Sequence, residues 1–118
     1  MILVDTSVWV DHLRLGNAAL EQLLKQELVA THPFIIGELS CGNIRNRASV
    51  LADLEELQSV SVVDHDEVMH LVTHRGLSGI GIGWVDAHVL TSAVVSNCRI
   101  WSLDKALMRA AAELEINA

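Results

Sequence analysis

The sequence predicts an α/β fold: a three-layer α/β/α sandwich around a central parallel sheet of four or five strands. Short apolar runs alternate with longer helical patterns along the chain, which favours parallel strands joined by helical crossovers. The length of 118 residues suits one domain, and Leu, Val and Ile supply 39 of them, enough for a hydrophobic core. Because the chain shows no linker, repeat or low-complexity segment, we expect a single domain over residues 1–118.

Short apolar runs mark the expected strands. The first run, Ile2-Leu3-Val4, is continuous rather than alternating, as in a strand that is buried on both faces. The expected strands are Ile2–Val4, Leu28–Ala30, Val60–Val63 and Arg99–Leu103.

Helical periodicity and end signals mark the expected helices. Ser7 is placed to cap the first helix, Pro33 stands at the favoured first position of the third, and Gly76 closes the fifth. A glycine-rich loop, Gly76 to Gly83, leads to the sixth helix, which is apolar on nearly every side and should be buried. The expected helices are Ser7–Arg14, Ala18–Gln26, Pro33–Gly42, Arg47–Leu57, Asp66–Arg75, Val85–Ser96 and Lys105–Glu113.

Composition narrows the classes of function. The formal charge is −7 and no run of Lys or Arg exists, which argues against a basic nucleic-acid tail and favours cations or a basic partner. Three Trp and one Phe are the only large aromatic residues, so the sequence indicates no base-stacking platform. The longest uncharged run, Ala87 to Cys98, is well short of the ~20 residues that a membrane span needs. With two isolated cysteines, we expect a cytoplasmic protein with reduced thiols and no membrane contact.

Four acidic residues fall at positions where a charge needs an explanation. Asp5 and Asp104 directly follow the first and last predicted strands, whose carboxyl ends meet at the ligand-binding edge of a doubly wound sheet. Glu38 and Asp86 lie on apolar helices, where an ionised carboxylate is costly unless it is paired or bound to metal.

Each acid also has a structural explanation when it is taken alone. Asp5 suits a turn, Asp104 an N-cap, and Asp86 the first turn of a helix. Glu38 is harder to explain, because no Lys or Arg lies within one helical turn of it. Carboxylates gathered in one cleft repel each other, and a hard divalent ion such as Mg²⁺ or Mn²⁺ relieves that repulsion.

Four segments together resemble the PIN-domain family, and above all the VapC-type toxins of bacterial toxin–antitoxin pairs. The resemblance runs from residue 2 to residue 104, with the motifs in the family's order, and therefore covers nearly the whole chain. The segments are Ile2-Leu3-Val4-Asp5-Thr6-Ser7-Val8-Trp9, Gly37-Glu38-Leu39, Gly83-Trp84-Val85-Asp86-Ala87-His88 and Trp101-Ser102-Leu103-Asp104.

The resemblance implies a set of site residues. It assigns Asp5, Glu38, Asp86 and Asp104 to an acidic metal site, with Asp104 in a supporting rather than a direct place. Ser102 matches the hydroxyl residue two positions before the last acid, where it would hydrogen-bond the site or its water, and Thr6 and Ser7 would orient Asp5.

The resemblance also implies an activity and partners. The activity is Mg²⁺- or Mn²⁺-dependent endonucleolytic cleavage of RNA, in which metal-activated water attacks phosphorus and leaves 5′-phosphate and 3′-hydroxyl ends. The partners are an RNA substrate, a cognate antitoxin that places a basic side chain among the carboxylates, and a second copy of the chain in a homodimer and a higher toxin–antitoxin complex. All four acids are present, so nothing favours a protein that kept the fold and lost catalysis.

A phosphoacceptor receiver domain is the alternative from a different class. Asp64 follows the third predicted strand, where such a domain carries its acceptor, and the length and the α/β alternation also fit. The match is poor elsewhere, because Thr6 stands where a second acid is wanted beside Asp5. Lys105 follows Asp104 by one residue, near the place of the expected lysine.

Overall fold

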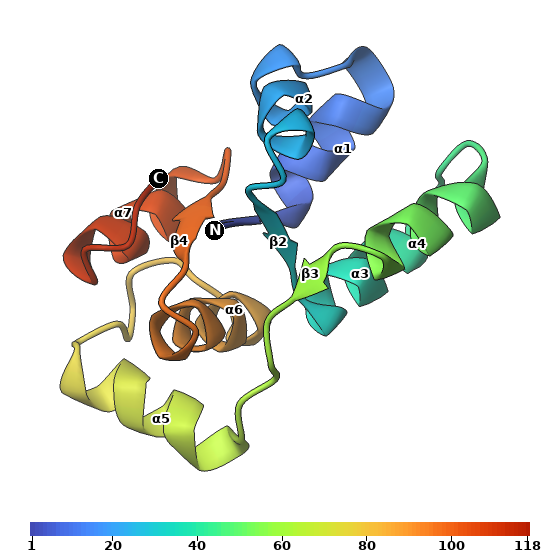
Figure 1. Cartoon of the computed structure of the whole chain (residues 1–118). Helices are drawn as coiled ribbons and strands as arrows, with labels where there is room; N and C mark the ends of the chain where they lie inside the picture. Colours follow the sequence, from blue (N-terminus) through green and yellow to red (C-terminus); the bar gives the residue numbers. More distant parts are fainter.

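A computed structural model describes all 118 residues, and a four-stranded parallel sheet lies at its centre (Figure 1). The strand order is β3-β2-β1-β4, and the register pairs Ile2 with Val29 and Val4 with Trp101. A single bridge between Ile100 and Asn117 adds the C-terminal segment beside β4. The strands are β1 (Ile2–Val4), β2 (Val29–Thr31), β3 (Gln58–Ser59) and β4 (Arg99–Trp101).

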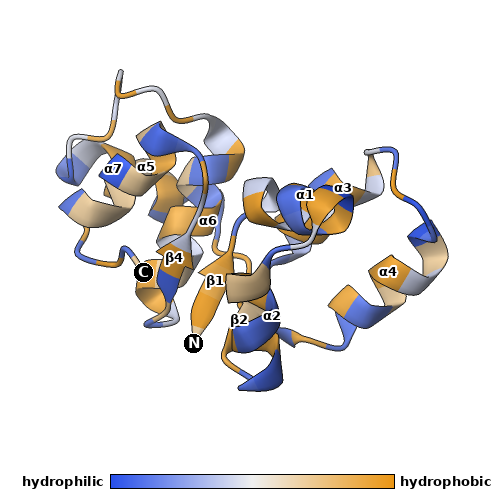
Figure 2. Cartoon of the chain, turned by 90° about the horizontal axis from the view of Figure 1, so that it is seen from above, coloured by the Kyte–Doolittle hydropathy of each residue, from blue (hydrophilic) through white to orange (hydrophobic).

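Seven helices cover the sheet, and the predicted three-layer α/β/α architecture is confirmed. Seen from above, α5, α6 and α7 lie on one side of the strands, and α1, α3 and α4 lie on the other (Figure 2). The helices are α1 (Thr6–Leu15), α2 (Ala18–Lys25), α3 (Pro33–Ser40), α4 (Arg47–Glu55), α5 (His65–His74), α6 (Trp84–Val95) and α7 (Lys105–Glu113). None of them combines the length and the apolar character that crossing a membrane requires.

The third strand is not where the apolar run placed it. The expectation was Val60–Val63, but the ladder holds only Gln58 and Ser59 and ends where Val60 N–H donates to Thr31 O at 2.8 Å. Val60 and Val63 are buried all the same, at 6% and 7% exposure, because their side chains pack while the backbone leaves the sheet toward α5. Burial without strand pairing produced the wrong assignment.

The cap of the first helix also differs from the expectation. Asp5, and not Ser7, is the N-cap of α1, with extended backbone angles of φ −69° and ψ 157°. Its N–H continues the β1–β4 ladder by donating to Trp101 O at 2.9 Å, so the helix begins at Thr6, directly after the strand residue. Ser7 therefore falls inside the first turn, where its hydroxyl can reach Asp5.

Buried apolar side chains pack on both sides of the sheet, and α6 is the helix with the most buried residues. Every residue of α6 from Ala87 to Ala93 is buried, and Leu3, Leu90 and Ile100 are fully enclosed. All four strands run in the same direction, so their carboxyl ends share one edge. The strand order reverses direction between β1 and β4, which makes this point of the edge the topological switch point, where doubly wound sheets bind ligands.

Candidate active site

The switch point brings together residues almost a hundred positions apart in the chain. Asp5 directly follows β1, and Ser102 directly follows its neighbour β4. Both side chains are buried, Asp5 at 9% exposure and Ser102 at 5%. The hydroxyl of Ser102 donates to Asp5 Oδ2 at 2.7 Å, so the first and last motifs of the sequence meet in one hydrogen bond.

Asp5 is held through one of its two oxygens. Oδ2 accepts from the Ser7 N–H at 3.3 Å and lies 2.7 Å from each of the Ser7 and Ser102 hydroxyls. The hydroxyl oxygens themselves accept from the Leu103 and Asp104 N–H groups, each at 2.9 Å. These backbone donors occupy lone pairs on the hydroxyls, which leaves their protons to point at the carboxylate.

This arrangement leaves Asp5 Oδ1 without a protein partner while its orientation is fixed. An ionised, buried carboxylate with a free oxygen is a ligand suited to a hard cation. Its place at the N-terminus of α1 also favours the negative charge, since the helix dipole is positive there. The geometry therefore fits Asp5 as a metal ligand.

Glu38 reaches the same edge from α3, the helix that follows β2. It is exposed, and Thr6 Oγ1 donates to its Oε1 at 2.7 Å. Thr6 is the residue next to Asp5, so this bond ties the second acid to the end of β1. Glu38 keeps its other carboxylate oxygen free.

Asp86 occupies the third position of α6, and its carboxyl turns back to accept from Gly83 N–H at 3.3 Å. Its pKa is raised, first because burial penalises the charged form and then because Asp5, Asp104 and Glu38 are charged nearby, against the lowering effect of the Gly83 bond. The repulsion from all three other acids shows that the four carboxylates share one electrostatic environment. No basic side chain is among the causes of the shift.

Asp104 is the N-cap of α7, as its structural interpretation predicted. Its Oδ1 accepts from the Ala106 and Leu107 N–H groups at 2.9 and 3.2 Å. The capping task uses one oxygen and leaves the other exposed, which suits a supporting place at the rim of the site.

The four acids share the edge without converging on one point. No group of three His, Cys, Asp or Glu side chains is close enough to enclose a single ion. Magnesium usually retains several waters and uses only one or two carboxylates, so it does not require three acids to converge. The donor set, all carboxylate oxygen with no hydrogen-bonded lysine or arginine, fits a hard divalent cation.

Asp64, the acceptor of the alternative receiver interpretation, has a different position and task. It lies five residues after β3, where the chain has left the sheet, and its Oδ1 accepts from Glu67 N–H at 2.8 Å as the N-cap of α5. Asp64 is also not one of the three acids that raise the pKa of Asp86. The receiver interpretation is therefore not favoured.

A row of aromatic and imidazole rings beside the acids was not predicted from the sequence. Adjacent rings in it are 4.8 to 5.1 Å apart, and the row runs from a buried interior end to an exposed end at the start of α5. Its members come from three separate segments, the starts of α3 and α5 and the first turns of α6, so no local pattern reveals it. In order, the row is His32, Phe34, His88, Trp84 and His65.

His32 is the interior end of this row and is fully buried. Its Nδ1 accepts from Phe34 N–H at 2.9 Å as the N-cap of α3, which places the proton on Nε2, 3.0 Å from Ser92 Oγ. Burial, assisted by repulsion from His88, lowers the pKa of His32 to about 4, so the ring is neutral at physiological pH. No pattern in the sequence indicated the contact between the buried residues His32 and Ser92.

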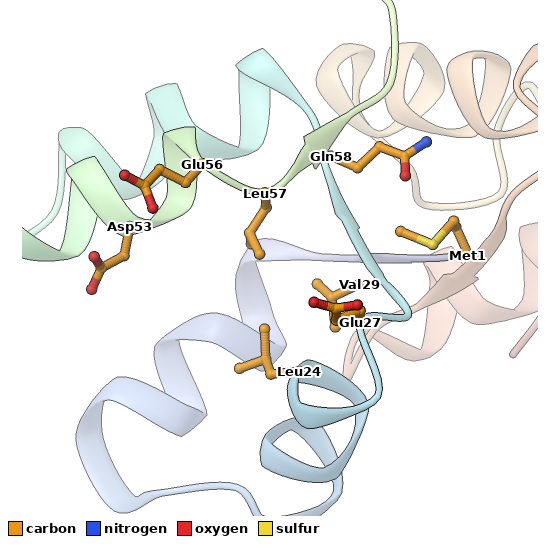
Figure 3. A pocket seen from close by; sticks show the side chains of 8 residues that line it. All are labelled: Met1, Leu24, Glu27, Val29, Asp53, Glu56, Leu57 and Gln58. Atoms are coloured by element: carbon orange, nitrogen blue, oxygen red, sulfur yellow. The ribbon is translucent and has the colours of Figure 1, made fainter.

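A hollow of about 410 Å³ lies at the other edge of the sheet (Figure 3). Its apolar floor includes Leu24 and Leu57, and acidic side chains stand around it. The strands begin at this edge, so the hollow is remote from the four candidate acids. It is lined by Met1, Leu24, Glu27, Val29, Asp53, Glu56, Leu57 and Gln58.

Comparison with known proteins identifies the class to which this fold and site belong. The profile of the PIN domain family matches residues 2–113. The crystal structure of PAE2754 from Pyrobaculum aerophilum superimposes with a TM-score of 0.67 over 99% of this chain and 87% of that one, at 21% identity, which supports the fold. The chain belongs to the PIN domain family.

Sequence relatives place the chain more narrowly. It is 49% identical over 114 residues to Ribonuclease VapC32 of Mycobacterium tuberculosis, found in two strains, and the match covers 96% of this chain and 92% of the relative. The resemblance to VapC-type PIN proteins, inferred from four short segments, is thereby confirmed across nearly the full length.

Proposed function

We propose that this chain is a metal-dependent endoribonuclease and the toxin of a toxin–antitoxin pair, carried by a single PIN-like domain over residues 1–118. The observation that supports it best is the buried Asp5 carboxylate at the β1–β4 switch point, oriented through Oδ2 by two serines and free at Oδ1. The 49% identity to a protein named as a ribonuclease supports the reaction class.

The cation is Mg²⁺ or Mn²⁺, held by Asp5 and Asp86 with Glu38, and with Asp104 in support. When bound, it would supply an activated water for attack on phosphorus and positive charge beside the reacting phosphate. The chain's own contribution is to hold Asp5 in one orientation and to gather acids whose mutual repulsion favours cation uptake. Burial and repulsion from the neighbouring acids raise the pKa of Asp86, and a bound cation would offset that repulsion and favour the ionised carboxylate.

Ser102 and Thr6 act through the acids that they bind. Ser102 donates to Asp5 and accepts from Asp104 N–H, so it links a proposed ligand to the supporting acid. Thr6 holds Glu38 at the end of β1. We assign Ser102 to the catalytic set as a residue that orients Asp5. The proposed reaction leaves products with 5′-phosphate and 3′-hydroxyl ends.

The partners follow from the charge of the site and from the family. RNA brings more negative charge to an edge that already carries four acids, so binding should depend on the cation. A cognate antitoxin with a basic side chain would occupy the same edge favourably and block it. We further propose a cytoplasmic homodimer that joins a larger complex with this antitoxin.

End-mapping of total RNA that has been treated with the purified protein tests this proposal. With Mg²⁺ or Mn²⁺, the protein should cut at discrete sites and leave 5′-phosphate ends, which a phosphate-dependent ligase captures. Chelation with EDTA and the Asp5→Asn variant should each remove these ends. Folded wild-type protein that cuts no RNA with either metal would contradict the proposal.

A further inference from the structure

Trp84 is a large apolar side chain that is 44% exposed beside the candidate site. It is the first residue of α6 and stands two positions before Asp86. Exposure alone carries little weight, since Leu15 is 85% exposed with no evident purpose. Trp84 differs because its ring is held in a defined orientation.

Two neighbouring imidazoles hold the Trp84 ring. His88, one helical turn later on α6, meets it edge-on at a centroid distance of 4.8 Å and an angle of 89°. His65, at the start of α5, lies against it at 5.0 Å and 48°. A ring supported from two helices loses little further freedom when a ligand stacks on it, which lowers the entropic cost of binding.

The support continues into the interior. His88 is only 7% exposed, and its Nδ1 has no hydrogen-bond partner, so ring packing rather than polar contacts fixes its position. Its other neighbour is Phe34 at 4.9 Å, which lies one turn before Glu38 on α3. The rings therefore join α3 to α6 and hold Trp84 in the same rigid unit as Glu38 and Asp86.

Helix geometry sets what Trp84 can touch. With 3.6 residues per turn, positions 84 and 86 project to nearly opposite sides of α6, about one helix width apart. Trp84 therefore does not share a phosphate with Asp86. If an RNA strand crosses the N-terminal end of α6, the exposed Trp84 ring can meet the base of the nucleotide next to the phosphate at Asp86.

We propose that Trp84 is a base-stacking residue, on which a nucleobase adjacent to the scissile phosphate lies. This inference rests on the proposed ribonuclease function and adds the residue that positions a single-stranded part of the substrate. Aromatic rings bind any base by its flat face, and protein recognition of RNA concentrates on unpaired bases. The scarcity of aromatics in the composition argued against such a surface, but one supported ring is sufficient.

RNA binding without cleavage provides the direct test. The probe is a fluorescein-labelled single-stranded RNA of mixed sequence, titrated by anisotropy with protein that keeps Asp5, with Ca²⁺ in place of Mg²⁺ so that the carboxylates hold a cation while cutting is suppressed. Trp84→Leu keeps an apolar side chain but has no ring, and should weaken binding about tenfold. Trp84→Phe restores a ring and should bind within about threefold of the parent. Val95→Ala, at the exposed far end of α6, serves as the matched control and should bind like the parent.

Two further readouts separate stacking from a packing role and from dimer contact. The same RNA with abasic riboses should bind the parent and the Trp84→Leu protein equally, because no base is left to stack. In the cleaving background, Trp84→Leu should raise KM more than it lowers kcat, while thermal stability and size in solution stay unchanged.

Equal affinity of parent and Trp84→Leu for the intact RNA would overturn the inference. So would equal losses in the Leu and Phe variants with lowered stability, or a loss of the dimer in place of a loss of RNA affinity. Failure of the wild-type protein to cut RNA is a separate result, since it rejects the proposed function itself.

Discussion

The two edges of the sheet are both acidic, but only one of them holds its acids in place. At the carboxyl-terminal edge, a hydroxyl or a backbone N–H donates to each of the four candidate carboxylates. At the amino-terminal edge, Glu27, Asp53 and Glu56 surround the hollow of Figure 3, and none of their side chains accepts a hydrogen bond.

The direction of the helices explains this difference. Helices in a parallel α/β fold begin at the carboxyl-terminal edge, and their free N–H groups and positive dipole ends favour carboxylates there. Asp5, Asp86 and Asp104 all use such N–H groups at the starts of α1, α6 and α7. The other edge receives helix C-termini, which present carbonyl oxygens that cannot donate. Acidity of an edge is therefore not sufficient for a metal site, because donors must also orient the acids.

The largest expected effect contrasts one acid from each edge. Loss of a residue that only hydrogen-bonds a metal ligand costs about 10- to 100-fold in activity. Asp5→Asn removes a proposed ligand itself, so it should lower RNA cleavage by more than about a hundredfold. Asp53→Asn removes the same charge at the amino-terminal edge and should cut at the wild-type rate. Initial rates on one RNA at saturating Mg²⁺ measure both. Equal losses in the two variants would show that bulk charge, and not position, matters.

The next effect tests orientation rather than charge. Ser102→Ala removes the hydroxyl that donates to Asp5 Oδ2 and should reduce the rate or the metal affinity by roughly 10- to 100-fold. Ser102→Thr retains the hydroxyl and should recover most of that loss. Rates measured across a Mn²⁺ titration distinguish weaker metal binding from a slower step. A Ser102→Ala protein with wild-type rates at every Mn²⁺ concentration would remove Ser102 from the site.

His32 supplies a pH dependence at the same edge. Its pKa falls from 6.5 to about 4 on folding, so the unfolded chain binds a proton that the folded chain refuses between these values. As the pH drops from 6.5 to 4, His32 should therefore lower the free energy of unfolding by about 3 kcal/mol in total. Below pH 4 this contribution of His32 should change no further.

The measurement is urea denaturation at several pH values. His32→Asn can still cap α3 but does not titrate, so its stability should fall less than that of the wild type over this window. The two proteins differ only at position 32, so contributions from residues elsewhere cancel in the difference. Parallel curves for the two proteins would contradict the assignment of a neutral, buried His32.

The smallest expected effect is on stability: Asp86→Asn should stabilise the metal-free protein although it should lower RNA cleavage. Because its pKa is raised in the folded protein, its charge destabilises the metal-free fold at neutral pH, and this cost disappears at pH values below its unfolded pKa. Asp86→Asn should therefore raise the melting temperature in EDTA at pH 7 and abolish any further rise with Mn²⁺. A lower melting temperature in EDTA would show that the carboxylate is stabilising as it stands.

The sequence predicted most of the fold because its signals are local. Pro33 begins α3 and Lys105 begins α7 as expected, and the continuous apolar run of Ile2–Val4 is a buried strand. The third strand was misplaced because Val60 and Val63 are buried by side-chain packing alone. An apolar run indicates that side chains are buried. Whether the backbone pairs in an edge strand such as β3 depends on where the chain leaves the sheet.

The candidate site was only partly accessible from the sequence. Adjacency of β1 and β4 is enough to bring Asp5 near Ser102, but the shared oxygen Oδ2 depends on side-chain geometry. The ring row joins His65, Trp84 and Phe34 from separate segments, and no spacing along the chain encodes it. Long-range side-chain contacts of this kind emerge only from the folded arrangement.

Titration of the metal-free protein with Mn²⁺, followed by electron paramagnetic resonance, tests the central claim most directly. The wild type should reduce the signal of free Mn²⁺ by binding it at the carboxyl-terminal edge. Asp53→Asn should bind equally well, and Asp5→Asn should lose most of the affinity. Wild-type affinity in Asp5→Asn together with lost affinity in Asp53→Asn would place the cation at the other edge and contradict the account.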